Sequence, residues 1–211
     1  MKIVVLAGGL SPERNVSLST GTMVTEALRA LGHRAGLIDL YFGLETGGVD
    51  EAFFDAPVSE AYKKISREAP DLDQVRRGRK GDSPSMFGPG VLELCRMADM
   101  VFLALHGTCG EDGRVQAAFD LMGIPYTGSG PLSSGMAMDK GITKMVFEAK
   151  GVPTPKGVTL QKGKCSSELA DYDMDFPVIV KPCCGGSSVG VCIAKNQEEY
   201  EAALDESFSY E

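Results

Sequence analysis

The first forty residues alternate between two kinds of hydrophobic pattern, and this alternation restricts the possible fold more than any other feature. Lys2–Ala7 is a short run rich in Val and Ile, which is typical of a strand that is buried on both faces. After the turn at Gly8-Gly9, the pattern predicts a helix from residue 16 or 17 to Leu31 and a second strand over Arg34–Leu40. Strand, helix and strand in this order predict a doubly wound α/β domain with a parallel sheet.

The predicted first helix has apolar side chains at helical spacing, and we expect them to pack on the sheet. They are Val16, Met23, Val24, Ala27, Leu28 and Leu31. Residues 41–88 are rich in Gly and Pro, and there we predict loops around one short helix near Ser59–Arg67. Beyond them, the predicted elements are a strand at Asp99–Leu105 and helices at Gly90–Ala98, Arg114–Met122 and near Leu132–Met138.

The second half of the chain predicts a separate α+β domain. We place the boundary after the Gly-rich segment that ends at residue 130, so that the domains span residues 1–130 and 131–211. Asp139 is a predicted cap of a helix that runs to Lys150, with Lys140 and Lys144 on one face. We expect Lys144 to be a surface lysine. A strand at Lys156–Gln161, two strands around a Gly/Ser hairpin and a helix capped by Asn196 follow.

The Gly/Ser hairpin has the chemistry of a phosphate-binding loop. Lys181 stands at the end of the strand 178–181, and Gly185 and Gly186 allow backbone N–H groups to converge. Ser187 and Ser188 add hydroxyl donors. The segment differs from a Walker A loop because no Gly-Lys-Ser/Thr follows the glycines.

Composition excludes several function classes. A net charge of −8 argues against a nucleic-acid partner or an anionic membrane surface, and no apolar stretch approaches the roughly 18 to 20 residues of a membrane span. The six cysteines contain no CxxC pair and there are only two histidines, so the spacing of a structural zinc site is lacking. These features predict a cytoplasmic protein with reduced thiols.

Five sequence patterns occur in a specific order along most of the chain. They are Ala-Gly-Gly-Leu-Ser-Pro-Glu-Arg-Asn-Val-Ser-Leu (7–18), Ala-Leu-His-Gly-Thr-Cys-Gly-Glu-Asp-Gly (104–113), Gly-Ile-Pro-Tyr-Thr-Gly-Ser-Gly (123–130), Met-Asp-Lys-x-x-x-Lys (138–144) and Val-Ile-Val-Lys-Pro-x-x-x-Gly-Ser-Ser-Val-Gly (178–190). In identity and order they resemble the D-alanine–D-alanine ligase family of the ATP-grasp superfamily. The resemblance covers nearly the whole chain except residues 41–88.

The resemblance implies an enzyme of three domains. These 211 residues would hold the N-terminal domain and most of a central ATP-grasp domain, as the front part of a longer polypeptide. The implied reaction uses ATP to convert one D-alanine to an acyl phosphate, which the amine of a second D-alanine attacks to form a peptidoglycan precursor. The implied Mg²⁺ ligands lie outside these residues, so we expect no metal ligands in this chain and no ligase activity from it alone. Family members pair through the N-terminal domain, which implies a homodimer.

The resemblance also implies roles for individual residues. Glu13 would bind the ammonium of the first D-alanine, and Ser187 would hydrogen-bond Glu13, which makes these two the implied catalytic pair. His106 would lie beside the carboxylate of the first substrate. The implied ATP-binding residues are Lys140, Lys181, Gly185, Gly186, Ser187 and Ser188.

The chain departs from the family pattern at two places. Asn15 stands where an acidic residue is common, and Cys183-Cys184-Gly185 stands where a more polar stretch is frequent. Two other functions stay open from the sequence: a ligase that joins D-alanine to D-lactate, and a binding or dimerisation module without catalytic activity.

Overall fold

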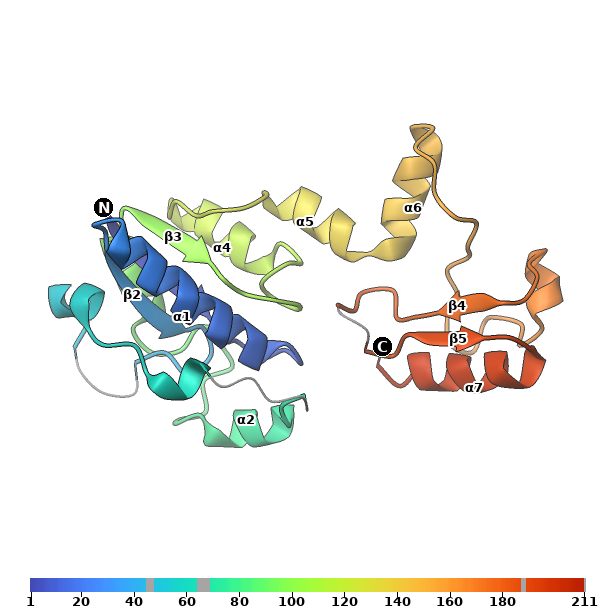
Figure 1. Ribbon diagram of the computed structural model, residues 1–211, viewed down its shortest axis with the longest axis horizontal. Helices are drawn as coiled ribbons and strands as arrows, with labels where there is room; N and C mark the ends of the chain where they lie inside the picture. Colours follow the sequence, from blue (N-terminus) through green and yellow to red (C-terminus); the bar gives the residue numbers. More distant parts are fainter. Residues whose placement is uncertain (45–47, 64–68, 187–188, 211) are drawn as a thin grey trace. The chain divides into compact units, whose positions relative to one another are not determined.

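The computed structural model describes residues 1–44, 48–63, 69–186 and 189–210 (Figure 1). They form two compact units, residues 1–135 and 136–211. The division falls inside helix α5 (Pro131–Met138), and the domain boundary at residue 130 stays a prediction. Within the described ranges, no helix has the length and apolar character that crossing a bilayer requires.

A three-stranded parallel sheet forms the centre of the first unit. Its strands are β1 (Lys2–Ala7), β2 (Arg34–Asp39) and β3 (Met100–Leu103), in the order β2-β1-β3. All six residues of β1 pair with β2, beginning with Lys2 opposite Arg34. The predicted α/β class with a parallel sheet is confirmed.

Helix α1 (Arg14–Ala30) packs on one face of this sheet, and α3 (Val91–Met97) and α4 (Arg114–Met122) pack on the other. The first unit also contains α2 (Leu72–Gly78), which has no buried residue, and short 3₁₀ helices at Glu51–Asp55 and Glu60–Lys63. Sequence analysis missed α2, whose cap is Asp71: its Oδ1 accepts the N–H groups of Asp73 and Gln74 at 2.9 and 3.1 Å. The short helix expected over residues 59–67 is a 3₁₀ turn at Glu60–Lys63, and residues 64–68 lie outside the described part.

The core has two layers because successive side chains of β1 point to opposite faces. Val4 and Leu6 pack with residues of α3 and α4 in one layer. Ile3, Val5 and Ala7 pack with Leu18 of α1 in the other. Both faces of β1 are therefore buried, as its unbroken apolar run predicts.

The prediction for the buried face of α1 is right for Val24 and Leu28, which pack against this layer, and wrong for Ala27 and three larger residues, which are exposed. Val16, Met23 and Leu31 are 43%, 60% and 75% exposed. Apart from Arg14 and Leu18, the buried positions are small or hydroxylated: Ser17, Ser19, Gly21, Thr22 and Thr25. A side chain at Gly21 would come within 2.7 Å of the Ala7 Cβ, so the helix lies too close to the sheet for larger residues. The buried Thr22 and Thr25 hydroxyls bind carbonyls one turn back in the helix.

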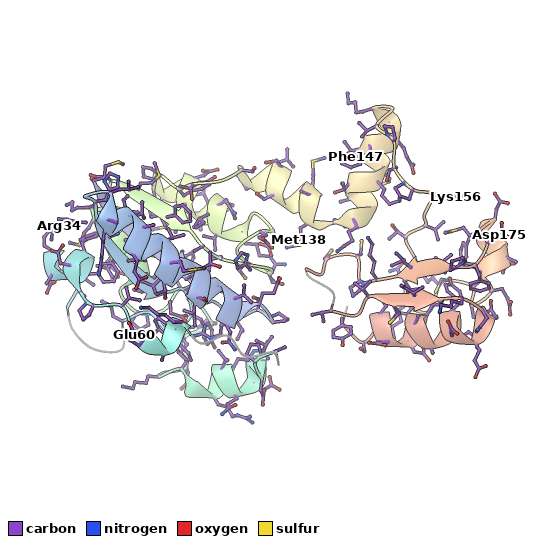
Figure 2. All side chains as sticks on the ribbon, in the orientation of Figure 1. Arg34, Glu60, Met138, Phe147, Lys156 and Asp175 are labelled. Atoms are coloured by element: carbon purple, nitrogen blue, oxygen red, sulfur yellow. The ribbon has the colours of Figure 1, made fainter. Side chains whose placement is uncertain are left out.

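A buried ion pair fixes the start of α1 to the end of β2. Arg14 and Asp39 are 5% and 3% exposed, and Arg14 Nη2 donates to Asp39 Oδ2. Arg14 Nη1 also donates to the Gly9 carbonyl at 2.6 Å, and the guanidinium stacks 4.7 Å from the ring centre of Phe42. Other ion pairs of the first unit lie on the surface. Arg34, for example, pairs with Glu51 and Asp55 and is exposed to solvent (Figure 2).

The second unit contains α6 (Lys140–Ala149), β4 (Val178–Val180), β5 (Cys192–Ala194) and α7 (Gln197–Ser207), with a 3₁₀ helix at Leu169–Tyr172. The two strands are antiparallel, and α7 packs on them through Tyr200 and Leu204. Asn196 caps α7 as predicted: its Oδ1 accepts the Glu199 N–H at 2.9 Å.

The predicted strand at residues 156–161 is wrong, because these residues pair with no other strand in the described ranges. An apolar, β-branched run forms a strand only where a partner supplies hydrogen bonds to its backbone. Here the segment instead lines a cavity.

We predict that Asp39→Ala lowers the free energy of unfolding by about 3–5 kcal/mol, because it leaves the Arg14 charge buried without its partner. Denaturant unfolding monitored by circular dichroism measures this loss. The matched control is Asp55→Ala, which breaks an exposed pair with Arg34 and should change stability little. Equal losses in the two variants would contradict a central role for Arg14–Asp39.

Candidate functional site

In the first unit, the predicted substrate residues meet at the carboxyl ends of β1 and β3, where α/β sheets bind ligands. Glu13 is the residue immediately before α1, and its side chain makes no capping hydrogen bond. The backbone N–H of Glu13 donates to Ser11 Oγ at 3.2 Å, and this hydroxyl donates to the His106 carbonyl at 2.8 Å. Ser11 thus joins the loop before α1 to the segment after β3.

The Glu13 carboxylate lies against the backbone of Gly107. Gly107 has φ +70°, and a Cβ at this position would stand 3.2 Å from Glu13 Oε2. A larger residue would therefore be strained and would crowd the carboxylate. The structure brings Glu13 together with the His106-Gly107 segment, two positions that are far apart in the sequence.

Two residues that sequence analysis did not assign surround the His106 ring. Thr20 Oγ1 lies 3.4 Å from Nε2, and Glu111 Oε1 lies 3.7 Å from Nδ1. Glu111 Oε2 also accepts the Gly107 N–H at 2.8 Å, so Glu111 holds both the ring and the adjacent backbone. The sequence offered one signal for Glu111, namely that it lies in the same 104–113 pattern as His106. This spacing alone does not show that the loop folds back and brings Glu111 to the His106 ring.

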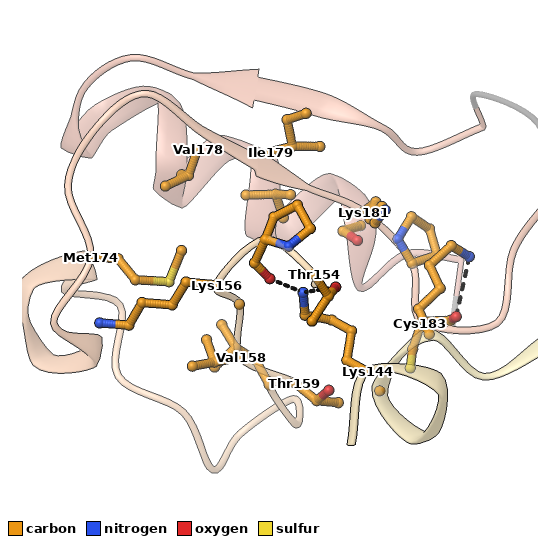
Figure 3. A pocket seen from close by; sticks show the side chains of 18 of the residues that line it. Lys144, Thr154, Lys156, Val158, Thr159, Met174, Val178, Ile179, Lys181 and Cys183 are labelled. Atoms are coloured by element: carbon orange, nitrogen blue, oxygen red, sulfur yellow. Dashed lines mark hydrogen bonds between the residues drawn. The ribbon is translucent and has the colours of Figure 1, made fainter. Parts of the chain in front are cut away.

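In the second unit, a cavity of about 790 Å³ opens between α6, β4 and the segment 154–160 (Figure 3). Its walls combine apolar side chains such as Val158, Met174 and Val178 with four lysines. The lysines are Lys140, Lys144, Lys156 and Lys181. A cavity with apolar walls and several ammonium groups suits a ligand that has an apolar ring and an anionic tail.

Lys140 attaches the loop after β4 to the start of α6. Its Nζ donates to the Gly185 and Cys183 carbonyls at 2.6 and 3.2 Å, and its backbone N–H donates to the Cys183 carbonyl at 3.1 Å. The preceding Asp139 caps α6 through the Ile142 N–H, and this hydrogen bond is the main reason why the pKa of Asp139 is lowered. The first part of the predicted phosphate-binding loop, at Cys183 and Gly185, is thus held by Lys140, which is also predicted to bind phosphate.

Two other lysines of the cavity hold its walls. Lys144, expected as a surface lysine, is half-buried, and its Nζ donates to the Pro155 carbonyl and to Thr154 Oγ1 at 3.3 Å. The Lys156 ammonium donates to Asp173 Oδ2 at 2.6 Å. Lys181 follows β4 and is exposed.

The predicted roles of Ser187 and Ser188 fall on residues that lie outside the described part of the chain. Gly185 and Gly186 are described and half-buried. Within the described residues, the first unit therefore offers the Glu13 carboxylate beside the His106-Gly107 segment. The second offers a cavity lined by four lysines, next to the loop that contains Gly185 and Gly186.

Comparison with known proteins also divides the chain into two parts. Residues 2–129 match the D-ala D-ala ligase N-terminus, and residues 146–211 match the D-ala D-ala ligase C-terminus. The D-alanine–D-alanine ligase of Lacticaseibacillus casei (strain BL23) is 45% identical over 213 residues, which cover 100% of this chain and 59% of that relative.

Solved structures give the same result. The D-alanine–D-alanine ligase from Bacillus anthracis has a TM-score of 0.68 and 30% identity, over 100% of this chain and 55% of that one. The same enzyme complexed with ATP has a TM-score of 0.67 and 28% identity, over 100% of this chain and 56% of that one. With both parts matched and these relatives similar along its whole length, the chain belongs to the D-alanine–D-alanine ligase family.

Proposed function

We propose that this chain is part of a ligase that uses ATP to join two D-alanines through an acyl phosphate. The chain spans about three fifths of the length of the curated relative that it matches, so the complete reaction is a proposal. The observation that carries it is the cavity of the second unit, where Lys140 holds the glycine loop beside three further lysines. Family membership and the ATP-bound relative support the same reading.

In the first unit, Glu13 would bind the ammonium of the first D-alanine. A substrate ammonium that leaves water needs a carboxylate partner, and Glu13 presents one that is not used to cap α1. His106 would face the substrate carboxylate with its ring positioned by Thr20 and Glu111. The support for this placement is the contact of Glu13 with Gly107, next to His106.

In the second unit, Lys140 and Lys181 would bind phosphate oxygens of ATP, which supplies the phosphoryl group to the substrate carboxylate. Ammonium groups and N–H donors that are already in position stabilise charge as it moves during phosphoryl transfer. Lys144 would shape the cavity, since its ammonium is bound to the 154–155 segment. We assign Mg²⁺ to none of the described residues, and the location of its ligands outside residues 1–211 stays a prediction.

We predict that the chain binds ATP and that Lys140→Met weakens this binding about tenfold or more. Methionine keeps the length of the side chain but removes a charge-assisted hydrogen bond, which is worth about 1.5–3 kcal/mol. Titration calorimetry with ATP at fixed ionic strength measures the affinity. Lys150→Met, at the exposed end of the same helix, is the control and should bind as the unchanged chain does.

Comparable ATP affinity in Lys140→Met and Lys150→Met would overturn the assignment of Lys140. The unfolding temperature of each variant without nucleotide separates lost binding from lost folding, because Lys140 also holds the loop at Cys183 and Gly185.

We predict that D-alanine stabilises the chain, whereas L-alanine does not, and that Glu13→Gln removes most of the effect. A ligand that binds only the folded state raises the unfolding temperature, and the glutamine keeps the size of Glu13 without its charge. Thermal unfolding at increasing amino-acid concentration provides the measurement. The control Glu26→Gln changes an exposed carboxylate of the same helix and should respond as the unchanged chain does. An undiminished response in Glu13→Gln would show that another group binds the ammonium.

We also propose that the chain forms a homodimer through the first unit. Val16, Met23 and Leu31 are exposed on α1 at intervals of seven and eight residues, so they form one apolar stripe along the helix. If this stripe met the same stripe of a second chain, the contact would be isologous and would give a C2 dimer, the commonest soluble homo-oligomer.

We predict that Met23→Lys shifts the dimer towards monomer in sedimentation experiments at micromolar concentration. The reason is that a charge placed in the middle of an apolar contact has to be desolvated. Leu121→Lys is the matched control, since Leu121 is 90% exposed on α4, away from the stripe. A sedimentation coefficient that responds equally to both substitutions, or to neither, would exclude α1 as the interface.

A further inference from the structure

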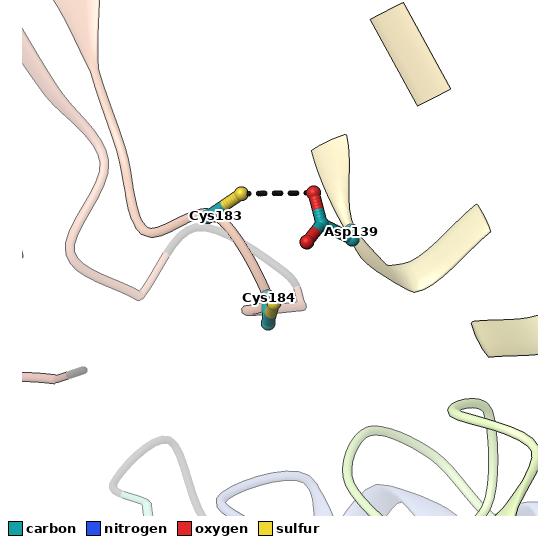
Figure 4. A group of neighbouring side chains, drawn as sticks. All are labelled: Asp139, Cys183 and Cys184. Carbon is teal, nitrogen blue, oxygen red and sulfur yellow. Dashed lines mark hydrogen bonds between the residues drawn. The ribbon is translucent and has the colours of Figure 1, made fainter. Parts of the chain in front are cut away.

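Two thiols and a carboxylate meet where the loop after β4 reaches the start of α6 (Figure 4). The ligand atoms of Asp139, Cys183 and Cys184 all lie within 4.8 Å of one another. Cys183 Sγ donates a hydrogen bond to Asp139 Oδ1 at 3.2 Å. The 3.2 Å separation suits two ligands of one small cation, whose bonds to sulfur and oxygen are about 2.0–2.3 Å long, and the Cys184 thiol is near enough to become the third ligand after a short movement.

Hydrogen bonds hold two of the three residues, Asp139 and Cys183, in place. Asp139 is fixed as the cap of α6, since its Oδ1 accepts the Ile142 N–H at 2.9 Å. Cys183 is fixed because its carbonyl accepts hydrogen bonds from both the N–H and the ammonium of Lys140. Ordering these ligands therefore requires little movement when a cation binds.

Access and charge also suit a cation. Asp139 and Cys183 are half-buried, whereas Cys184 is exposed, so one side of the cluster is open to solvent. A dication with two thiolates and one carboxylate has a net charge of −1. The Lys140 ammonium, bound to the Cys183 carbonyl, would offset that charge.

We propose that Asp139, Cys183 and Cys184 form a binding site for Zn²⁺, with water as the fourth ligand. Thiolates select Zn²⁺ over Mg²⁺, which prefers oxygen ligands in octahedral geometry. On binding, each thiol loses its proton to solvent, and the two thiolates and the carboxylate bond to the metal. The proposal rests on these three residues and does not depend on the proposed function.

The chain contains its own matched control. Cys192 Sγ lies 3.2 Å from Glu206 Oε2, which is the same distance as that between Cys183 and Asp139. This second pair includes one thiol where the proposed site has two. A cation that needs both thiolates should therefore bind at Cys183 and Cys184 and ignore Cys192.

The test is titration of the reduced chain with Co²⁺, a spectroscopic substitute for Zn²⁺, followed by displacement with Zn²⁺. We expect one Co²⁺ per chain and the strong visible bands of tetrahedral thiolate coordination. Cys183→Ser and Cys184→Ser should abolish these bands, whereas Cys192→Ser should leave them unchanged. Asp139→Asn keeps a residue that can cap α6 but removes the charge, and should weaken Co²⁺ binding about tenfold or more.

Four results would overturn the proposal: no thiolate bands in the unchanged chain, bands that persist in Cys184→Ser, bands that Cys192→Ser also abolishes, or Co²⁺ bound only between two chains in sedimentation. The unfolding temperature without metal is measured for each variant. Any variant that proves unfolded is replaced by the corresponding alanine.

Discussion

The buried ion pair of Arg14 and Asp39 fixes the geometry of the first unit at the place where ligands are expected to bind. Asp39 is the last residue of β2, and its Oδ1 accepts the N–H groups of Tyr41 and Phe42 at 2.8 and 3.0 Å. Two charges that leave water lose hydration, and they are tolerated only when their hydrogen bonds are made within the protein. These bonds hold Arg14 in one position, and with it the adjacent Glu13. Gly8 is required in this arrangement, because a side chain there would collide with the Asp39 carboxylate.

In the second unit, the groups of the candidate site are held in place by hydrogen bonds from lysines to backbone carbonyls. Among its described residues the sheet has two short strands, and lysines that bind carbonyls hold the cavity walls together. Lys140 fixes the loop after β4, and Lys144 fixes the segment 154–155. The same lysines give the cavity its positive charge. The Lys144 ammonium is thus used inside the second unit, which explains why a surface role for Lys144 was a wrong expectation.

Sequence analysis predicted the parallel sheet because the Val- and Ile-rich runs have few alternatives. For the buried face of α1 it was right about Val24 and Leu28 but missed most of the buried positions, because apolar spacing does not reveal that Ser, Gly and Thr permit close packing on β1. It was also wrong about residues 156–161, since strand formation depends on a partner that is remote in the sequence. The motifs led to Glu13, His106 and Lys140, but not to Glu111 or to the cluster of Asp139 with Cys183. Those contacts depend on how loops fold, and in the second case they join residues 44 positions apart.

We propose that the first unit binds the amino acid and the second binds the nucleotide. Two-dimensional ¹H–¹⁵N spectra of the labelled chain, with D-alanine and ATP added separately, distinguish the two sites. We expect D-alanine to shift the backbone signals of Glu13 and Gly107, and ATP to shift those of Lys140, Cys183 and Gly185. If ATP left the signals of the second unit in place, or if D-alanine shifted them instead of those around Glu13, this division of binding between the units would be wrong.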